Sequence, residues 1–383
     1  MSTTLTLPID RDVPPSNTPT VFVRLLLIPV VLAAAFLRTQ ELSTVGVSFD
    51  ESFCQKMVEF SWREMFHRMS LDVHPPLFYI ILKAWGNIWG HGVVAGRALS
   101  AMLGVLSVVG TYAFVRKAYL SPSTPGHANL WNAEVPAVLA AALIAIAPLQ
   151  LFWTLQIRMY SLMLTLVVWS AFLLMRALDD DRKRLFDWAL YTFSASLMIH
   201  THPYAIFVCF SQFLYAVVYC IRMRPGAIVA RMKPVLGSAF CLWISFQLWL
   251  PVFLEQNSRV STEIHYFPKP TMAMLGKTIH ELWVGTGVPL SSTTGLMLMQ
   301  ASFLILLGAM IARRPADFFL FVSAAFPVAA AIVISTFSQP IIYARYFMFS
   351  QVFVIVAASV LVCRLPRLRL ILVPVLLAIA AFP

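Results

Sequence analysis

The stretch VVAGRALSAMLGVLSVVGTYAFV, residues 93–115, holds a single charged side chain, Arg97, in 23 residues. A helix needs about 20 mainly apolar residues to cross the hydrocarbon core of a bilayer, so this stretch predicts a transmembrane helix. Comparable apolar runs recur along the chain and predict an all-α polytopic membrane protein with about eleven transmembrane helices. The ten other runs are 21–37, 133–152, 155–176, 186–206, 207–221, 235–254, 293–312, 317–336, 343–363 and 367–383.

The composition also indicates that the bilayer is the solvent of this chain. Of its 383 residues, 60% are apolar and 12% are charged, and the mean hydropathy is +0.79, which excludes a soluble domain of this size. The net charge is +11, and the basic residues lie in short clusters between apolar runs. This distribution is typical of residues that set the orientation in the membrane and predicts no nucleic-acid partner. The five cysteines form no C-x-x-C pair and indicate neither a disulfide framework nor a zinc site.

The distribution of basic residues predicts the orientation in the membrane. With the N-terminus in the cytoplasm, 17 of the 28 lysines and arginines fall on the inner side, and every short inner loop carries at least two. The first apolar run lacks a nearby cleavage site, which favours a retained signal-anchor helix. In this orientation, two long segments, 38–92 and 255–292, lie on the outer side.

The first outer segment is too apolar for a linker and predicts two short interfacial helices. Phe49, Phe53, Met57 and Phe60 recur at helical spacing, so 49–66 is expected to be an amphipathic helix at the interface. Residues 76–89 predict a second helix with proline in its first turn. No soluble domain, repeat or low-complexity tract is visible.

Ionisable groups at membrane depth are costly and therefore mark candidate functional sites. In the predicted topology they gather at the outer ends of helices, beginning with Asp50 and Glu51. Ser48 and Glu51 have the spacing of a capping box, so a purely structural role is as well supported as a catalytic one. In the catalytic role, one carboxylate accepts a proton from an acceptor hydroxyl and the other positions a partner.

Two further groups have the chemistry to hold an anion. His74 precedes a helix N-terminus, where it either caps the helix or contacts a phosphate or sugar. Arg158, followed by Tyr160, either extends to the head-group layer or pairs with a phosphate through bidentate contacts. Arg345 and Tyr346 repeat this arginine-plus-aromatic pattern, which is equally typical of an interfacial belt.

His200 and His202 stand in a turn between two apolar runs. Without a carboxylate close in sequence, the pair is a weak metal signal, and hydrogen bonding to sugar or phosphate, or a structural role, is better supported. The sequence therefore indicates no metal site or cofactor, although it is compatible with a bound divalent ion.

The order and sidedness of four motifs resemble a known group of enzymes. The motifs are Asp50-Glu51 in the first outer loop, His74-Pro75-Pro76-Leu77 in the same loop, Arg97 at the start of the second helix, and Arg158-x-Tyr160 at the outer start of the fourth. Together they resemble the GT-C-fold glycosyltransferases of the protein O-mannosyltransferase and aminoarabinose (lipid A) transferase superfamily. The resemblance covers about residues 20–260.

The resemblance implies inverting transfer of a sugar from a polyprenyl-phosphate carrier at the outer membrane face. Asp50 would be the general base or acceptor-orienting carboxylate, Glu51 its neighbour, and Arg158 a ligand of the carrier phosphate. His74, Arg97, Tyr160, His200, His202, Arg345 and Tyr346 are the further candidates for donor binding. A preplaced cation suits this chemistry, because charge develops on the departing phosphate in the transition state.

The chain departs from the family pattern at Gln156. The acidic residue that often precedes the family's Ala-Arg is Gln156 here, so the role of that carboxylate is not carried over. Acceptor recognition is expected from the outer loops 38–92 and 255–292.

The sequence thus predicts a GT-C transmembrane module at 1–260 and a region of outer loop and transmembrane helices at 261–383. The expected partners are the membrane, a polyprenyl-phosphate-linked sugar and a lipid, glycan or protein acceptor. The expected location is a bacterial-type inner membrane, with the active site on the periplasmic face. The alternative is a lipid-linked-sugar flippase or small-molecule transporter, which should show inverted repeats and interrupted helices with polar groups near the midplane.

Overall fold

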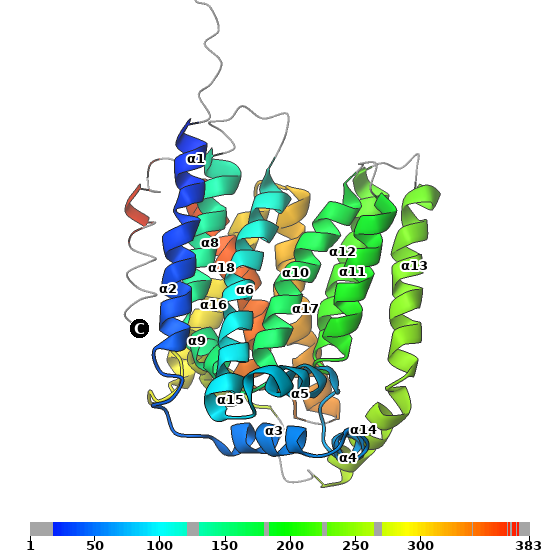
Figure 1. Ribbon diagram of the computed structural model, residues 1–383. Coiled ribbons are helices and arrows are strands. Elements are labelled where there is room, and N and C mark those ends of the chain that lie inside the picture. Colours follow the sequence, from blue (N-terminus) through cyan, green and yellow to red (C-terminus); the bar gives the residue numbers. More distant parts are fainter. Residues whose placement is uncertain are drawn as a thin grey trace, which may run out of the picture.

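The computed structural model describes residues 18–120, 130–179, 184–223, 228–263, 270–338 and 340–365, together with 367, 370–372 and 374. Within these residues the chain is helical, without a strand (Figure 1). The helices are α1 (Thr18–Leu25), α2 (Leu27–Thr39), α3 (Phe49–Glu59), α4 (Trp62–Leu71), α5 (Leu77–Trp89), α6 (Val93–Tyr119), the π-helical turn η1 (Leu130–Glu134), α8 (Val135–Ile146), α9 (Pro148–Leu155), α10 (Tyr160–Leu178), α11 (Arg184–Ile199), α12 (Ala205–Met223), α13 (Ile228–Gln247), α14 (Leu250–Glu263), α15 (Met272–Val284), α16 (Ser292–Met310), α17 (Pro315–Phe337) and α18 (Ala344–Cys363).

The predicted all-α polytopic fold is confirmed. Among the described residues, 8 helices are long and apolar enough to cross a membrane, or 9 if the bent pair formed by 130–146 and 148–155 counts as one span. The apolar helix α11 is shorter than these spans. The predicted eleventh run, 367–383, lies largely outside the described residues.

Burial separates central helices from peripheral ones. In the apolar windows of α10 and α18, 78% and 83% of residues are buried within the protein, against 17% in both α13 and α16. The last helix α18 packs against α8, α9 and α10, so C-terminal and N-terminal segments share one core. Phe114, Phe319 and Phe353 meet there edge to face or tilted, with ring centroids 5.4–6.1 Å apart.

Two glycines allow α15 and α16 to pack backbone against backbone. A Cβ atom on Gly295 would stand 1.6 Å from the carbonyl oxygen of Gly276, and one on Gly276 would stand 2.3 Å from the carbonyl oxygen of Ser292. Small residues at such crossings are a recurrent way of joining helices in lipid, where there is little hydrophobic driving force between helices.

The third span is broken between Ile146 and Pro148, where α8 and α9 bend by 60°. Proline has no amide hydrogen, so the break leaves carbonyl groups of α8 without helical partners. Arg38, which is fully buried, donates to the carbonyl oxygens of Ala145 (2.9 Å) and Ile144 (3.5 Å) and to the Thr154 hydroxyl (3.0 Å). The buried cation therefore joins both halves of the bent span.

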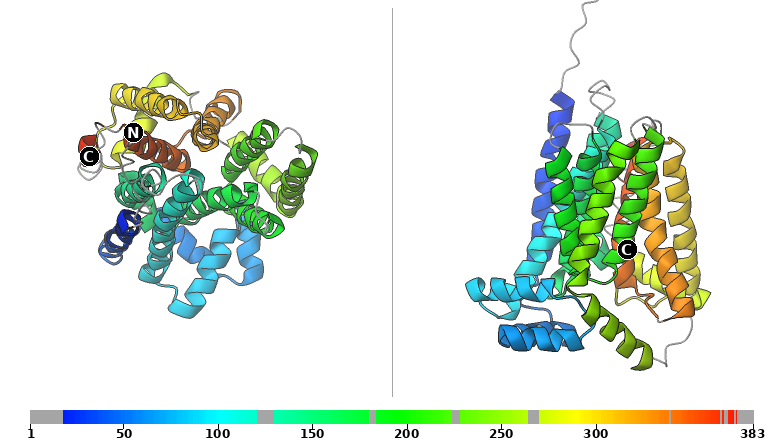
Figure 2. Two further views of the ribbon diagram at one scale, coloured as in Figure 1. Left: turned by 90° about the horizontal axis from the view of Figure 1, so that it is seen from above. Right: turned by 90° about the vertical axis from the view of Figure 1, so that its right-hand side faces the viewer.

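Short helices form a layer across one end of the bundle. α3, α4, α5, α14 and α15 lie there, with α3, α4 and α14 further from the spans than α5 (Figures 1 and 2). The predicted single helix at 49–66 is wrong, because the chain breaks at Phe60 and Ser61, whose side chain caps the amide of Glu64 (3.3 Å). The apolar residues that recur at helical spacing in this stretch are only partly buried, since Met57 is enclosed and Phe49 is 85% exposed. The predicted helix at 76–89 is present as α5.

Candidate active site

The helix layer and the adjoining ends of α10 and α18 bring together polar side chains from distant parts of the sequence. We call this set the polar cluster. It consists of Asp50, Asp72, His74, Arg158, Tyr160, His202, Arg345 and Tyr346.

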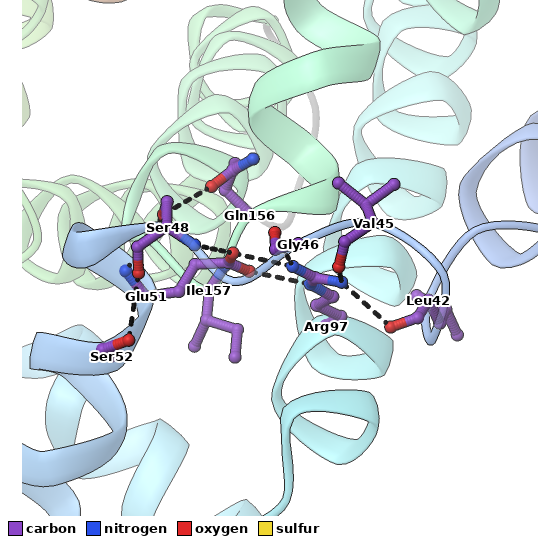
Figure 3. A network of polar contacts seen from close by, with 9 residues as sticks. All are labelled: Leu42, Val45, Gly46, Ser48, Glu51, Ser52, Arg97, Gln156 and Ile157. Carbon is purple, nitrogen blue, oxygen red and sulfur yellow. Dashed lines mark hydrogen bonds and ion pairs between the residues drawn. The ribbon is translucent and has the colours of Figure 1, made fainter.

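Beside the cluster, Glu51 and Arg97 form a buried bidentate ion pair (Figure 3). Both distances from guanidinium nitrogen to carboxylate oxygen are 2.8 Å. The carboxylate of Glu51 also accepts the amide hydrogens of Ser48 (3.1 Å) and Ile157 (3.2 Å). Burial alone would raise the pKa of Glu51, but the hydrogen bonds from Arg97 and the two amides outweigh it and lower the pKa. Glu51 is therefore held as a carboxylate.

All five hydrogen-bond donors of Arg97 are engaged within the protein. Besides Glu51, they reach the carbonyl oxygens of Leu42 (3.1 Å), Val45 (2.9 Å) and Gly46 (3.0 Å) (Figure 3). Arg97 was predicted to bind the sugar donor, but in this arrangement it has no N–H group left for a phosphate. The pair instead ties the loop before α3 and the segment at Ile157 to the start of α6.

The pair places Asp50 next to Arg158. Asp50 follows Phe49 in the first turn of α3, and its carboxylate oxygen lies 3.6 Å from a terminal nitrogen of Arg158. The Asp50 side chain is 39% exposed, whereas that of Arg158 is 6% exposed. Arg158 also approaches the Cys54 sulfur (3.8 Å), and its Nε has no hydrogen-bond partner among the described residues. An accessible carboxylate thus stands beside an enclosed cation that retains a free donor.

Asp72 orients His74 near Arg158. His74 Nδ1 lies 3.1 Å from an Asp72 oxygen, which also accepts the Tyr79 hydroxyl (3.3 Å). Burial would raise the pKa of Asp72, but the hydrogen bond and charge of His74, together with lesser contributions that include Arg158, lower it. A carboxylate bound to Nδ1 fixes the imidazole ring and directs Nε2 away from it.

His202 presents a neutral hydrogen-bond donor. Its Nδ1 accepts the amide hydrogen of Tyr204 (3.1 Å), so the proton of the neutral ring is on Nε2, which is buried and unpartnered among the described residues. Burial, followed by the positive fields of His74, Arg158 and Arg345, holds the pKa of His202 well below its usual value.

Arg345 is the second guanidinium of the cluster and is surrounded by aromatic rings. Its central carbon lies 4.9 Å from the Tyr343 ring centroid, 5.5 Å from that of Tyr346 and 5.7 Å from that of Trp153. Among the described residues Arg345 has no ion pair, and its Nε has no hydrogen-bond partner. Tyr346 in turn packs edge to face on His202, with ring centroids 4.8 Å apart, so the two motifs meet.

His200, although predicted with His202, makes separate contacts. Its Nε2 lies 2.9 Å from the Ser245 hydroxyl of α13, and its carbonyl oxygen accepts the amide hydrogen of Leu77 at the start of α5 (3.0 Å). These contacts attach α5 to the turn between α11 and α12. His200 therefore holds the layer that carries His74.

Three residues of the site, Tyr79, Cys54 and Trp153, were not predicted to take part in it. The sequence assigns no role to Asp72, although its spacing of two from His74 is an available signal. Tyr79 and Trp153 belong to apolar helices and Cys54 to the amphipathic helix α3, and only the tertiary contacts distinguish them from ordinary packing. Within the described part of the chain, no group of three or more His, Cys, Asp or Glu side chains is arranged to hold a metal ion.

Comparisons with known proteins identify the fold. Residues 73–249 match the family model described as dolichyl-phosphate-mannose-protein mannosyltransferase. The structure of ArnT from Cupriavidus metallidurans in the apo state superposes with a TM-score of 0.57 at 18% identity, over 91% of this chain and 61% of that one. The same enzyme bound to undecaprenyl phosphate gives 0.56 at 18% identity, with the same coverage.

A second solved relative is the archaeal oligosaccharyltransferase AglB from Archaeoglobus fulgidus, in complex with an inhibitory peptide and a dolichol-phosphate. It gives a TM-score of 0.53 at 14% identity, over 94% of this chain and 56% of that one. The chain thus spans little more than half the length of these relatives. No curated protein matches it at a significant level. The chain has the GT-C fold of the membrane glycosyltransferases and resembles, over residues 73–249, the dolichyl-phosphate-mannose-protein mannosyltransferases.

Proposed function

We propose that the chain is a glycosyltransferase that moves a sugar from a polyprenyl-phosphate carrier to an acceptor nucleophile, with inversion. The observation that carries the proposal is that Arg158, Arg345 and His202 each have a buried nitrogen without a hydrogen-bond partner among the described residues. Tyr160 and Tyr346 link the three, since each ring lies beside His202 and under one of the two guanidinium groups. Buried donors without protein partners are costly, so they indicate a bound anion with several acceptor oxygens. A phosphate ester of a lipid carrier has this chemistry.

The polar cluster can perform each step of a single displacement. Asp50 accepts the proton of the acceptor hydroxyl as its oxygen attacks the anomeric carbon of the sugar. The bond from that carbon to the phosphate oxygen breaks, and the electron pair remains on the phosphate. Arg158 and Arg345 stabilise the charge that develops there, and His202 donates a hydrogen bond to it. One displacement at one carbon inverts its configuration.

Glu51 and Arg97 act as positioning residues in this proposal. They bind the backbone just before Asp50, at Val45 and Ser48, and just before Arg158, at Ile157, and Arg97 has no free donor toward the cluster. Gln156 accepts the Ser48 hydroxyl (3.0 Å), so it supports the same turn in place of a carboxylate.

The transporter alternative predicts interrupted helices, and the chain contains one at Ile146–Pro148. In transporters, unwound carbonyl groups coordinate the ion. Here Arg38 donates hydrogen bonds to the carbonyl groups of Ile144 and Ala145, so these two groups are already engaged within the protein. This favours transfer chemistry over transport. The location we propose is the periplasmic face of a bacterial-type inner membrane.

The first experiment is mass spectrometry of lipids that copurify with the detergent-extracted protein. We expect the wild-type chain to retain a polyprenyl-phosphate sugar and Arg158→Ala to lose it. Arg68→Ala is the matched control, because Arg68 is an exposed arginine of the same helix layer, paired with Glu64. Equal retention by all three proteins, or no such lipid even when it is supplied, would refute the proposal.

The second experiment separates binding from chemistry with Asp50→Asn. The variant should retain the lipid-linked sugar and lose transfer by about 10² to 10⁴-fold, since it removes only the proton acceptor. The measurement is release of polyprenyl phosphate in single turnover with a range of acceptor mixtures. Full transfer activity in this variant would show that Asp50 is not the base.

A further inference from the structure

A cavity, which we call the inner cavity, lies at the end of the bundle opposite the polar cluster. It has a volume of about 380 Å³ and opens between the C-terminal ends of α6 and α10, the helix α12 and the start of α17. These helix ends stand at the top of Figure 1, away from the layer formed by α3, α4 and α5. Ligand sites commonly have volumes of about 300 to 1,000 Å³, so this cavity has room for a small polar group.

The wall of this inner cavity is basic. Its charged side chains are Lys117, Asp179 and Arg314, and its other polar groups include Asn132, Tyr215 and Tyr219. Lys117 is paired with Asp179, which is half exposed. Arg314 has no ion pair among the described residues. The cavity therefore presents one uncompensated cation and a second whose partner is accessible to solvent.

Nearby carboxylates are already occupied, so they do not neutralise Arg314. Asp317 accepts the Tyr119 hydroxyl (2.9 Å) and pairs with Arg364 (2.7 Å). Its other oxygen accepts the backbone amide of Arg314 (3.0 Å), which fixes this residue at the start of α17. The guanidinium is thus anchored through its backbone, while its side chain is available at the cavity.

The position of the inner cavity in the membrane indicates which anion it binds. In the predicted topology this end faces the cytoplasm, where the leaflet carries anionic lipids at the depth of the helix ends. Basic pockets between transmembrane helices on this side bind lipid head groups. We propose that the inner cavity binds the phosphate of an anionic phospholipid of the inner leaflet, held by Arg314 and Lys117. This site is independent of the proposed sugar transfer.

The test is titration of the detergent-solubilised full chain with dihexanoyl phosphatidylglycerol, followed by native mass spectrometry. It is done in the Arg158→Ala background, so that the polar cluster does not contribute. We expect saturable binding that Arg314→Gln weakens about tenfold, the loss of one charge-assisted contact. Arg313→Gln is the matched control, because Arg313 is exposed and does not line the cavity; it should bind as the background does.

A second variant tests the sign of the electrostatics and does not depend on Arg314. Asp179→Asn releases Lys117 and should tighten phosphatidylglycerol binding about threefold. Unchanged binding in this variant, or equal weakening by Arg313→Gln and Arg314→Gln, would overturn the site. Dihexanoyl phosphatidylcholine should bind more weakly than phosphatidylglycerol. If inorganic phosphate competes at the same concentration as the lipid, the lipid as source is refuted.

Discussion

Arg97 and Arg158 show how far residue type alone can be used to assign a role. Both are arginines near the outer end of a span, and both were predicted to bind the donor. The structure gives Arg97 five protein acceptors, whereas Arg158 retains an unpartnered Nε. Sequence spacing predicted the Ser48–Glu51 capping box, which is present. It could not show that Glu51 also pairs with Arg97, because that contact joins residues 46 positions apart.

The buried His202 predicts how stability changes with pH. Its pKa in the folded protein lies well below the usual 6.5 because of burial and nearby positive charge. Below pH 6.5 the unfolded chain binds a proton that the folded chain does not, so the free energy of unfolding falls as pH falls. The loss approaches about 1.4 kcal/mol per pH unit and ends at the folded pKa.

Replacement of His202 by Gln should remove this part of the pH dependence. The measurement is thermal unfolding of both proteins between pH 7.5 and 5.5, with His67→Gln as a control at an exposed histidine. His67→Gln should keep the pH dependence of the wild-type unfolding temperature. If His202→Gln keeps it as well, the assignment to His202 is contradicted.

At the scale of elements, helices were more predictable than their interruptions. Apolar runs located the spans because hydropathy is a local property. The bend between α8 and α9 was missed, although Pro148 lies at it, since proline also begins unbroken helices. The break is stabilised by Arg38 of α2, a contact across more than 100 residues. Likewise, residues 49–66 divide into α3 and α4 because Ser61 caps the start of α4. The helical spacing of the apolar residues in this stretch did not reveal that cap.

Arg38→Met tests whether the bent span depends on this cation. The variant leaves the carbonyl group of Ala145 and the hydroxyl of Thr154 without their buried donor, which should lower the free energy of unfolding by about 2 to 4 kcal/mol. Thermal unfolding in detergent gives the comparison. Arg68→Met, an exposed site, should change it by no more than about 0.5 kcal/mol. Similar values for the two variants would show that Arg38 is not needed at the break.

At the scale of the whole molecule, sequence predicted the fold class and the clustering of polar groups at one end. The loop assignments placed Asp50, His74, Arg158, His202 and Arg345 on one side, and the structure places them at one end of the bundle. What sequence could not provide was the order of helices around the core. The burial of α10 and α18 and the exposure of α13 and α16 arise from packing between distant segments.

The predicted orientation can be tested with single cysteines in intact cells. In a chain with the exposed Cys241 replaced by Ala, Ser43→Cys should react with a membrane-impermeant thiol reagent. Ala312→Cys, exposed at the opposite end, should react only after the membrane is permeabilised. Cysteine labelling with the reverse pattern would invert the topology and place the polar cluster on the cytoplasmic side.

The length of α6 has a consequence for the bilayer itself. Arg97 and Arg116 bracket its uncharged part, and both are fixed by carboxylates, Glu51 and Glu134. At 1.5 Å per residue, they lie about 28 Å apart along the axis. Because neither arginine is free to move along the membrane normal, α6 sets a preferred hydrocarbon thickness close to that value. Lipids with much longer chains would have to thin around the protein, and acyl-chain length becomes a physical variable of its activity.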